Sequence, residues 1–221
     1  MPKIPIRHCC FDRFVVDGAA REPARLPRRL ACRSEGLAFG CVTASLFVAI
    51  VPPPQAIATL VAAVEGLRAT TPGLSWIAPG RWHVTLCFLG PHEPNDELQA
   101  RLARVAARHE RLAIHVAGGG RFGDRVLFAK LAGDLKPLAA GVTRAAERSG
   151  YAVEDRPFHA HLTLARSRRG RIDLRPLLTA LSDVRGPDWT VGELRLMRSG
   201  QPDYETVSRW PLKSQSKLPS G

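Results

Sequence analysis

The sequence is short of several features that mark large classes of protein. It has only 2 Tyr, 4 Trp and 8 Phe among 221 residues. No apolar run approaches the ~20 residues that a membrane-spanning helix needs, and the start of the chain lacks the apolar core of a signal peptide. The Gly-x-x-x-x-Gly-Lys-Ser/Thr pattern of phosphate-binding loops is also missing. We therefore expect a cytoplasmic protein that does not contact a membrane.

Cysteine and lysine are scarce as well. Four of the five cysteines lie in the first 41 residues. Their spacing forms no paired Cys-x-x-Cys units, so no zinc site or other metal is predicted. Only 5 of the 32 basic residues are Lys, and the net charge is +12; the Arg bias, with abundant Ala, Gly and Pro, suggests a GC-rich bacterial genome. This charge suits an anionic partner such as RNA, although a solvated basic surface explains it equally well.

The first 44 residues differ from the rest of the chain. They show no sustained helical or strand periodicity, and the basic run over 21–29 is broken by proline. We expect this segment to be disordered or not naturally translated, with a GTG start codon at Val42 as one explanation. The folded part should span 45–212, and the tail over 213–221 should fray.

From Ser45 onward, apolar periodicity predicts alternating strands and helices. A flexible turn is expected at Gly118-Gly119-Gly120. The predicted strands are 45–51, 75–78, 81–90, 112–116, 126–131, 158–166, 188–198 and 205–212, and the predicted helices are 55–68, 96–109, 135–149 and 174–181. Strands outnumber helices and several neighbours form short hairpins. We therefore predict an α+β fold with two pseudo-symmetric lobes, each with a mainly antiparallel sheet and outer helices, around a central cleft.

Two of these strands carry the same polar pattern, 78 residues apart. Side chains alternate between the two faces of a strand, so His83 and Thr85 share one face, and His161 and Thr163 share one face of the second strand. By the same alternation Cys87 lies on the face of His83. We expect Cys87 to be a small packed residue rather than a nucleophile, because the sequence places no base beside it.

An imidazole and a hydroxyl on each of two strands suit one type of chemistry. Two histidines can act as general base and general acid near neutral pH, and hydroxyls can bind phosphate oxygens. The set is typical of metal-free, in-line hydrolysis of a phosphodiester. One motif alone is explained equally well by a structural histidine, but two copies favour catalysis.

Four segments in order resemble a known family. They are 45–53, 76–90, 156–166 and the closing hairpin at 196–199 with 204–205, so that the resemblance covers about 45–212. The pattern is similar to the 2H phosphoesterases, and within them to the RNA 2′,3′-cyclic phosphodiesterases, also called 2′–5′ RNA ligases. This resemblance implies a bilobal fold whose two motifs line a central cleft. It also implies hydrolysis of a 2′,3′-cyclic phosphate to a 2′-phosphomonoester, without a cofactor.

The resemblance assigns roles by position. His83 and His161 become the catalytic pair, Thr85 and Thr163 hold phosphate oxygens, and Arg166 stacks on the nucleobase. We assign His83 as the acid to O3′ and His161 as the base to water, although the pattern also fits the reverse order. Strict alternation puts Arg166 on the face opposite His161, so the stacking role requires the strand to end or twist before it.

One position departs from the family pattern. Ala160 stands where the family usually has proline before the second histidine, and His159 is an additional imidazole on the same face. We favour His161, because Thr163 follows it in register, and expect His159 to lie at the rim or to pack. The basic loop over 167–171 is either a solvated turn or a phosphate contact.

Two other functions remain open. The same cleft could serve a non-catalytic module that binds RNA ends, or the enzyme could join RNA by the reverse reaction. For each of the three, the expected partner is an RNA end or nucleotide with a 2′,3′-cyclic phosphate. No obligate protein partner is inferred, and a monomer is expected.

Overall fold

The structure, a computed structural model, describes residues 44–167, 170–200 and 203–214. The chain divides into two units, 1–43 and 44–221. The predicted extension over 1–44 therefore lies outside the described residues except for Ala44, as does the tail beyond residue 214. In the described part no helix has the length and apolar character needed to cross a membrane.

The helices and strands follow the predicted order closely. In chain order they are β1 (Leu46–Ile50), α1 (Pro54–Thr70), β2 (Leu74–Trp76), the 3₁₀ turn η1 (Pro79–Arg81), β3 (Val84–Gly90), α2 (Asp96–Arg108), β4 (Leu112–Phe122), β5 (Val126–Ala132), α3 (Lys136–Arg148), β6 (His161–Ser167), α4 (Arg175–Leu181), β7 (Trp189–Val191), β8 (Glu193–Arg198) and β9 (Glu205–Pro211).

Local sequence signals explain where the helices begin and end. Pro54 opens α1, where its missing N–H leaves no bond unmade. The side chain of Asn95 caps α2 by accepting a hydrogen bond of 2.7 Å from the backbone N–H of Leu98. Gly150 follows α3 with a φ of 86°, a conformation that glycine adopts without a steric penalty.

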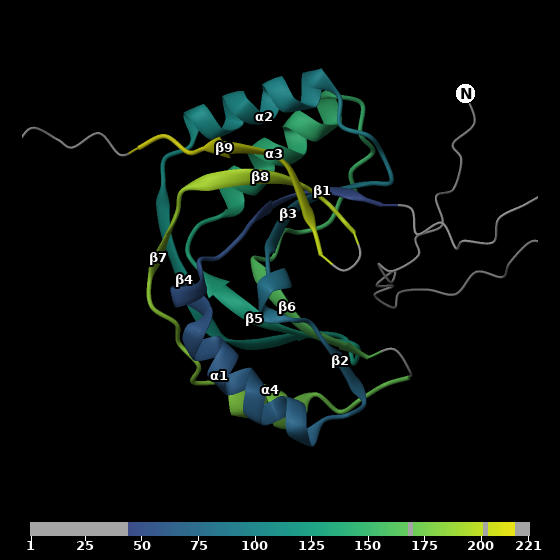
Figure 1. The fold of residues 1–221 in the computed structure, drawn as a ribbon, viewed down its shortest axis with the longest axis vertical. Coiled ribbons are helices and arrows are strands. Elements are labelled where there is room, and N and C mark those ends of the chain that lie inside the picture. The colour runs from purple at the N-terminus through teal and green to yellow at the C-terminus, as the bar shows by residue number, and fades with distance from the viewer. Residues whose placement is uncertain (1–43, 168–169, 201–202, 215–221) are drawn as a thin grey trace, which may run out of the picture. The chain divides into compact units, whose positions relative to one another are not determined.

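The strands form two antiparallel sheets, which confirms the predicted α+β class. One sheet has the order β3-β1-β8-β9 and the other β2-β6-β5-β4-β7. Helices α2 and α3 pack against the first sheet, while α1 and α4 pack against the second (Figure 1). The chain passes repeatedly between them: β1 belongs to the first sheet, but the helix that follows it covers the second. Each sheet contributes one motif strand, β3 or β6.

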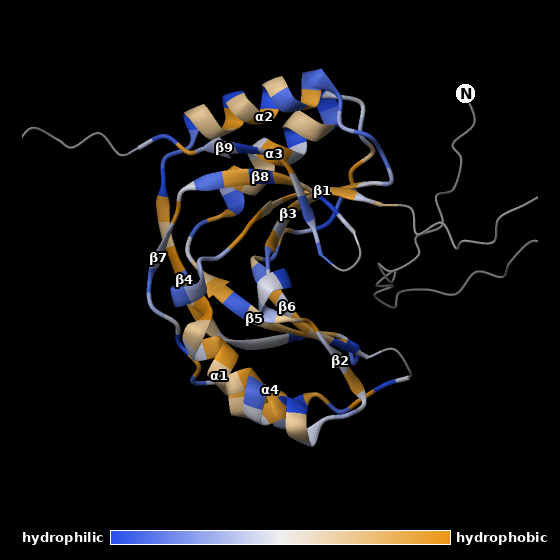
Figure 2. Cartoon of the chain, in the orientation of Figure 1, coloured by the Kyte–Doolittle hydropathy of each residue, from blue (hydrophilic) through white to orange (hydrophobic). Residues whose placement is uncertain are grey.

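One continuous hydrophobic core joins the two sheets and their helices. β1 is apolar along its whole length, whereas α2 carries both apolar and polar residues (Figure 2). Trp82, beside the first motif, is only 2% exposed. Its indole N–H donates to the carbonyl of Ile77 at 3.1 Å. The segment that leads into β3 is thereby fixed to the protein interior.

The prediction of a flexible turn at Gly118-Gly119-Gly120 was wrong, because β4 runs through all three residues. Glycine is needed there for close packing. A Cβ atom on Gly120 would lie 2.3 Å from the ring of Phe128, and one on Gly119 would lie 2.8 Å from the Cβ of Leu181. Glycine has a low β-propensity, but it occupies these strand positions because Phe128 and Leu181 leave no room for a larger residue.

The predicted strand over 188–198 was also wrong, because it is two strands in different sheets. β7 pairs with β4 in the second sheet, and β8 pairs with β1 in the first. Gly192 lies between them. A single apolar run therefore serves both sheets.

Candidate active site

The two motif histidines stand at the beginnings of equivalent strands. His83 directly precedes β3, and His161 is the first residue of β6. These two strands approach each other although they belong to different sheets. The charge of His161 contributes to lowering the pKa of His83, so the imidazoles lie within electrostatic range. The fold thus brings together the two motifs that the sequence separates by 78 residues.

Each imidazole is held in the same way. The Nδ1 atom of His83 lies 2.9 Å from the carbonyl oxygen of Arg81, and that of His161 lies 2.7 Å from the carbonyl oxygen of His159. A carbonyl oxygen can only accept a hydrogen bond, so Nδ1 carries the proton in both rings. This leaves each Nε2 free to take or give a proton. The sequence offered no signal for this anchoring.

Burial controls the protonation of both rings. It lowers the pKa of His83 to about 4, and it also lowers the pKa of His161. The positive charge of Arg166 adds a smaller effect of the same sign on both. At neutral pH both imidazoles are therefore neutral, each with a lone pair on Nε2. This state suits a general base, whereas an acid needs a proton that an anionic substrate would stabilise.

Aromatic rings flank each histidine, a feature that the sequence analysis missed. The rings come from neighbouring strands and from the segment before β9. The centroid distances are 4.8 Å for Phe47–His83, 5.0 Å for Tyr204–His83, 5.2 Å for Phe128–His161 and 5.0 Å for Phe122–His161. These contacts restrict the planes of the imidazoles and exclude water from one side of each. A cavity of about 150 Å³ adjoins His83 and Tyr204.

A register shift in β6 decides where Arg166 points. Thr163 pairs with Phe128 and Ala165 with Leu127, so Leu164 has no partner on β5. Such a bulge reverses the alternation of side chains beyond it. Arg166 therefore lies on the face of Thr163, and the alternation that placed it opposite His161 was wrong. Its stacking on a nucleobase remains a prediction.

A matching shift occurs in β3, again at the leucine after the motif threonine. Thr85 pairs with Ala49 and Cys87 with Val48, so Leu86 is left out. Cys87 consequently turns away from the motif face, and the prediction that it shares the face of His83 was wrong. It is 5% exposed, and burial raises the pKa of its thiol to about 11. This agrees with its predicted role as a packed residue.

The threonines stay on the motif faces. Thr85 lies opposite Ala49, two residues from the Phe47 ring that contacts His83. Thr163 lies opposite Phe128. Both threonines are half-buried. Each motif thus presents an imidazole and a hydroxyl on one face, as its spacing predicted; the binding of phosphate by these hydroxyls remains a prediction.

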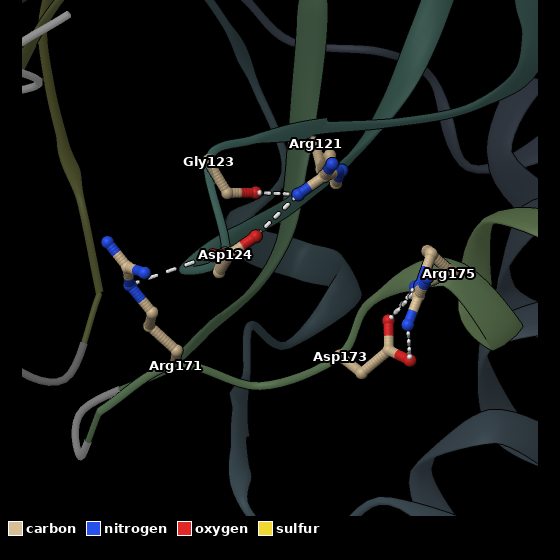
Figure 3. A network of polar contacts seen from close by, with 6 residues as sticks. All are labelled: Arg121, Gly123, Asp124, Arg171, Asp173 and Arg175. Carbon is tan, nitrogen blue, oxygen red and sulfur yellow. Dashed lines mark hydrogen bonds and ion pairs between the residues drawn. The ribbon is translucent and has the colours of Figure 1, made fainter. Parts of the chain in front are cut away.

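The additional histidine and the basic loop lie at the margin. His159 is exposed, and its backbone carbonyl, rather than its ring, holds His161. In the basic loop, residues 168–169 lie outside the described residues. Arg171 approaches Asp124 at 3.8 Å, and Asp124 also binds Arg121 (Figure 3). A carboxylate therefore partly offsets the charge of this loop.

No group of three or more His, Cys, Asp or Glu side chains within the described ranges is arranged to hold a metal ion. The guanidinium group of Arg166 acts electrostatically on the imidazoles of both motifs. This donor set favours an anionic ligand over a cation.

Known proteins resemble this chain in sequence and fold. The model of the 2'-5' RNA ligase superfamily matches residues 52–203. An RNA 2',3'-cyclic phosphodiesterase from Geobacillus stearothermophilus is 30% identical over 155 residues, 65% of this chain but only 49% of that relative. One from Thermus thermophilus is 30% identical over 190 residues, 77% of this chain and 91% of the relative.

One solved structure has a similar fold. The crystal structure of a Thermus thermophilus protein matches with a TM-score of 0.64 and 27% identity, covering 78% of this chain and 100% of that one. The family match spans a range of this chain that contains both histidine motifs. The chain therefore belongs to the 2'-5' RNA ligase superfamily, as its resemblance to the 2H phosphoesterases predicted.

Proposed function

We propose that the chain is an RNA 2′,3′-cyclic phosphodiesterase, which hydrolyses the cyclic phosphate at an RNA end or on a nucleotide to a 2′-phosphomonoester. The observation that carries this proposal is the pair of anchored imidazoles. His83 and His161 each direct Nδ1 to a backbone carbonyl and leave Nε2 free. The names of the relatives support the same activity.

The reaction needs one proton removed and one supplied. A water molecule attacks phosphorus in line with O3′, and one imidazole takes its proton at Nε2. The P–O3′ bond breaks, and the second imidazole protonates O3′, so that the product is a 2′-phosphate with a free 3′-hydroxyl. The hydroxyls of Thr85 and Thr163 bind the non-bridging oxygens as negative charge builds on them.

The lowered pKa values of the two histidines set a condition on their roles. We assigned His83 as the acid and His161 as the base. With a pKa of about 4 in the free protein, only about one His83 in a thousand is protonated at pH 7. The assignment therefore requires the bound phosphate to raise this pKa substantially. The reverse assignment makes the same demand on His161, because burial lowers its pKa too. The pH dependence of kcat and of kcat/KM reports the bound and free states separately.

The direct test is incubation with a nucleoside 2′,3′-cyclic phosphate in the presence of EDTA. Formation of the 2′-phosphate supports the proposal. Loss of activity with EDTA would refute a metal-independent mechanism. Retained RNA binding without turnover would indicate the non-catalytic module instead, and 2′–5′ linked products at high RNA concentration would reveal the reverse reaction.

Alanine variants test the residues. His83→Ala and His161→Ala should each reduce kcat by ~10²–10⁴-fold, the usual contribution of a general acid or base. Thr85→Val and Thr163→Val should reduce kcat by ~10²-fold, since each removes one donor to the transition state. His159→Ala is the matched control for His161, because it removes a neighbouring ring and keeps the carbonyl that anchors Nδ1. An inactive His159→Ala with an active His161→Ala would identify the other imidazole as catalytic.

A further inference from the structure

A cavity of about 540 Å³ lies between α3 and the segment that leads into β6. We call it the α3 pocket. The small residues Ala139, Ala140 and Thr143 line it along the helix. Residues 156–159 close the opposite side. Its volume falls within the range of sites that hold a nucleotide-sized ligand.

The charge of the α3 pocket is of one sign. Lys136, Arg144 and Arg156 line it, and no carboxylate does. Lys136 and Arg144 stand eight residues apart on one face of α3, which places their backbones about 12 Å apart along the axis. Arg156 approaches Glu154 at 3.4 Å, and that carboxylate is itself 59% exposed. The pocket thus presents separated cationic side chains around a largely small-residue surface, an arrangement suited to a ligand with more than one negative charge.

The α3 pocket adjoins the second motif. His159 lines the pocket, and its carbonyl holds the Nδ1 of His161. Arg156, on the same segment, lies near enough for its charge to act on that imidazole. Phe158, between them in sequence, also lines the pocket and packs against the core. The pocket and the second motif therefore share the segment that contains Arg156 and His159.

The chemistry of the proposed substrate requires a binding surface beyond the motif itself. A terminal nucleotide whose 2′ and 3′ oxygens are closed in a cyclic phosphate connects to its RNA chain only through O5′. We propose, resting on the proposed function, that the α3 pocket binds the RNA segment on this 5′ side, with Lys136, Arg144 and Arg156 contacting its phosphates. The preferred substrate class is then an oligoribonucleotide end rather than a free nucleotide.

The test compares two substrates on the same enzyme: a nucleoside 2′,3′-cyclic phosphate and a six-nucleotide RNA ending in the same group. The quantity measured is the ratio of the kcat/KM for the RNA to that for the nucleoside. In Lys136→Ala/Arg144→Ala the ratio should fall about tenfold. A plot of log kcat/KM for the RNA against log salt concentration should have a slope that is shallower by about 1.4. Each contact to a phosphate of single-stranded nucleic acid contributes about 0.7 to this slope, and the variant removes two such contacts.

The matched control is Arg104→Ala/Arg108→Ala, which removes two exposed charges from α2, outside the pocket. It should retain the ratio and the salt slope of the wild-type enzyme. An equal fall in the ratio for both double variants would show a general effect of net charge and overturn the pocket proposal. An unchanged ratio in Lys136→Ala/Arg144→Ala would overturn it as well.

Failure of the proposed function gives a different result. If neither substrate is turned over, the cyclic phosphodiesterase activity is refuted, while the pocket is still tested by fluorescence anisotropy with the same RNA carrying a 2′-phosphate end. Affinity reduced about tenfold in Lys136→Ala/Arg144→Ala, but not in the α2 control, would support the pocket. Equal affinities would refute it.

Discussion

Burial of His83 should make the folded protein sensitive to acid. Its pKa is about 4 in the folded state, against about 6.5 in an unfolded chain. The unfolded state therefore takes up this proton first, so the contribution of His83 to stability is complete above pH 6.5 and is lost as the pH falls toward 4. Linkage between these two pKa values gives a loss of about 2 kcal/mol between pH 7 and pH 5 and about 3 kcal/mol by pH 4.

The variant His83→Asn isolates this contribution. Asparagine does not titrate, and its side-chain amide can still donate to the carbonyl of Arg81. Urea denaturation in phosphate-free buffers at pH 7 and pH 5 measures the free energy of unfolding of both proteins. The difference at pH 7 reports the cost of replacing the ring. Between pH 7 and pH 5 the wild type should lose about 2 kcal/mol more than the variant, or about 4–8 °C in Tm. A difference that stays constant with pH would refute a buried, neutral His83.

Three other predictions test the surroundings of the site. Gly120→Ala should destabilise the protein by about 1–3 kcal/mol in urea denaturation, because the added Cβ would lie 2.3 Å from the ring of Phe128. The control is Gly66→Ala in α1, where an added Cβ would meet no atom within 4 Å. This control should stabilise the protein by up to about 1 kcal/mol. Arg166→Met should move the pH profile of kcat/KM to higher pH, since removing the charge raises the pKa of both motif histidines. An unchanged profile would contradict the placement of Arg166 on the motif face. Cys87 should resist thiol reagents at pH 8 until urea unfolds the chain. With a pKa of about 11, its thiolate is about a thousandfold less abundant than its thiol at that pH. Mass spectrometry of the labelled protein measures the extent of modification at Cys87.

Much of the fold could be predicted because the apolar periodicity and the helix signals agree with the tertiary structure. Asn95 caps α2 as its type predicts, and proline at the start of α1 and glycine beyond α3 mark real boundaries. The pairing of imidazole and hydroxyl on each motif was also predictable. A spacing of two residues in a strand leaves no other arrangement as long as the strand is regular.

What could not be predicted depends on contacts between distant residues. The bulges at Leu86 and Leu164 exist only in relation to the partner strands, so simple alternation misplaced Cys87 and Arg166. Gly120 looked like part of a turn, because the ring that requires its small size comes from another strand. The carbonyls that anchor the two imidazoles are backbone groups, which any residue type supplies. Sequence patterns carry little information about these features.

The alternation of the chain between the two sheets has a consequence for folding and movement. β1 and β8 are neighbours in one sheet although all five strands of the other sheet lie between them in sequence. Helix α3 packs on β3, while the strands before and after this helix belong to the other sheet. Neither half of the chain can complete a sheet by itself. We therefore expect residues 44–214 to unfold in one cooperative transition, and the distance between the two imidazoles to be maintained by several chain crossings rather than by a single hinge. Separately expressed halves should regain a site only when they assemble together.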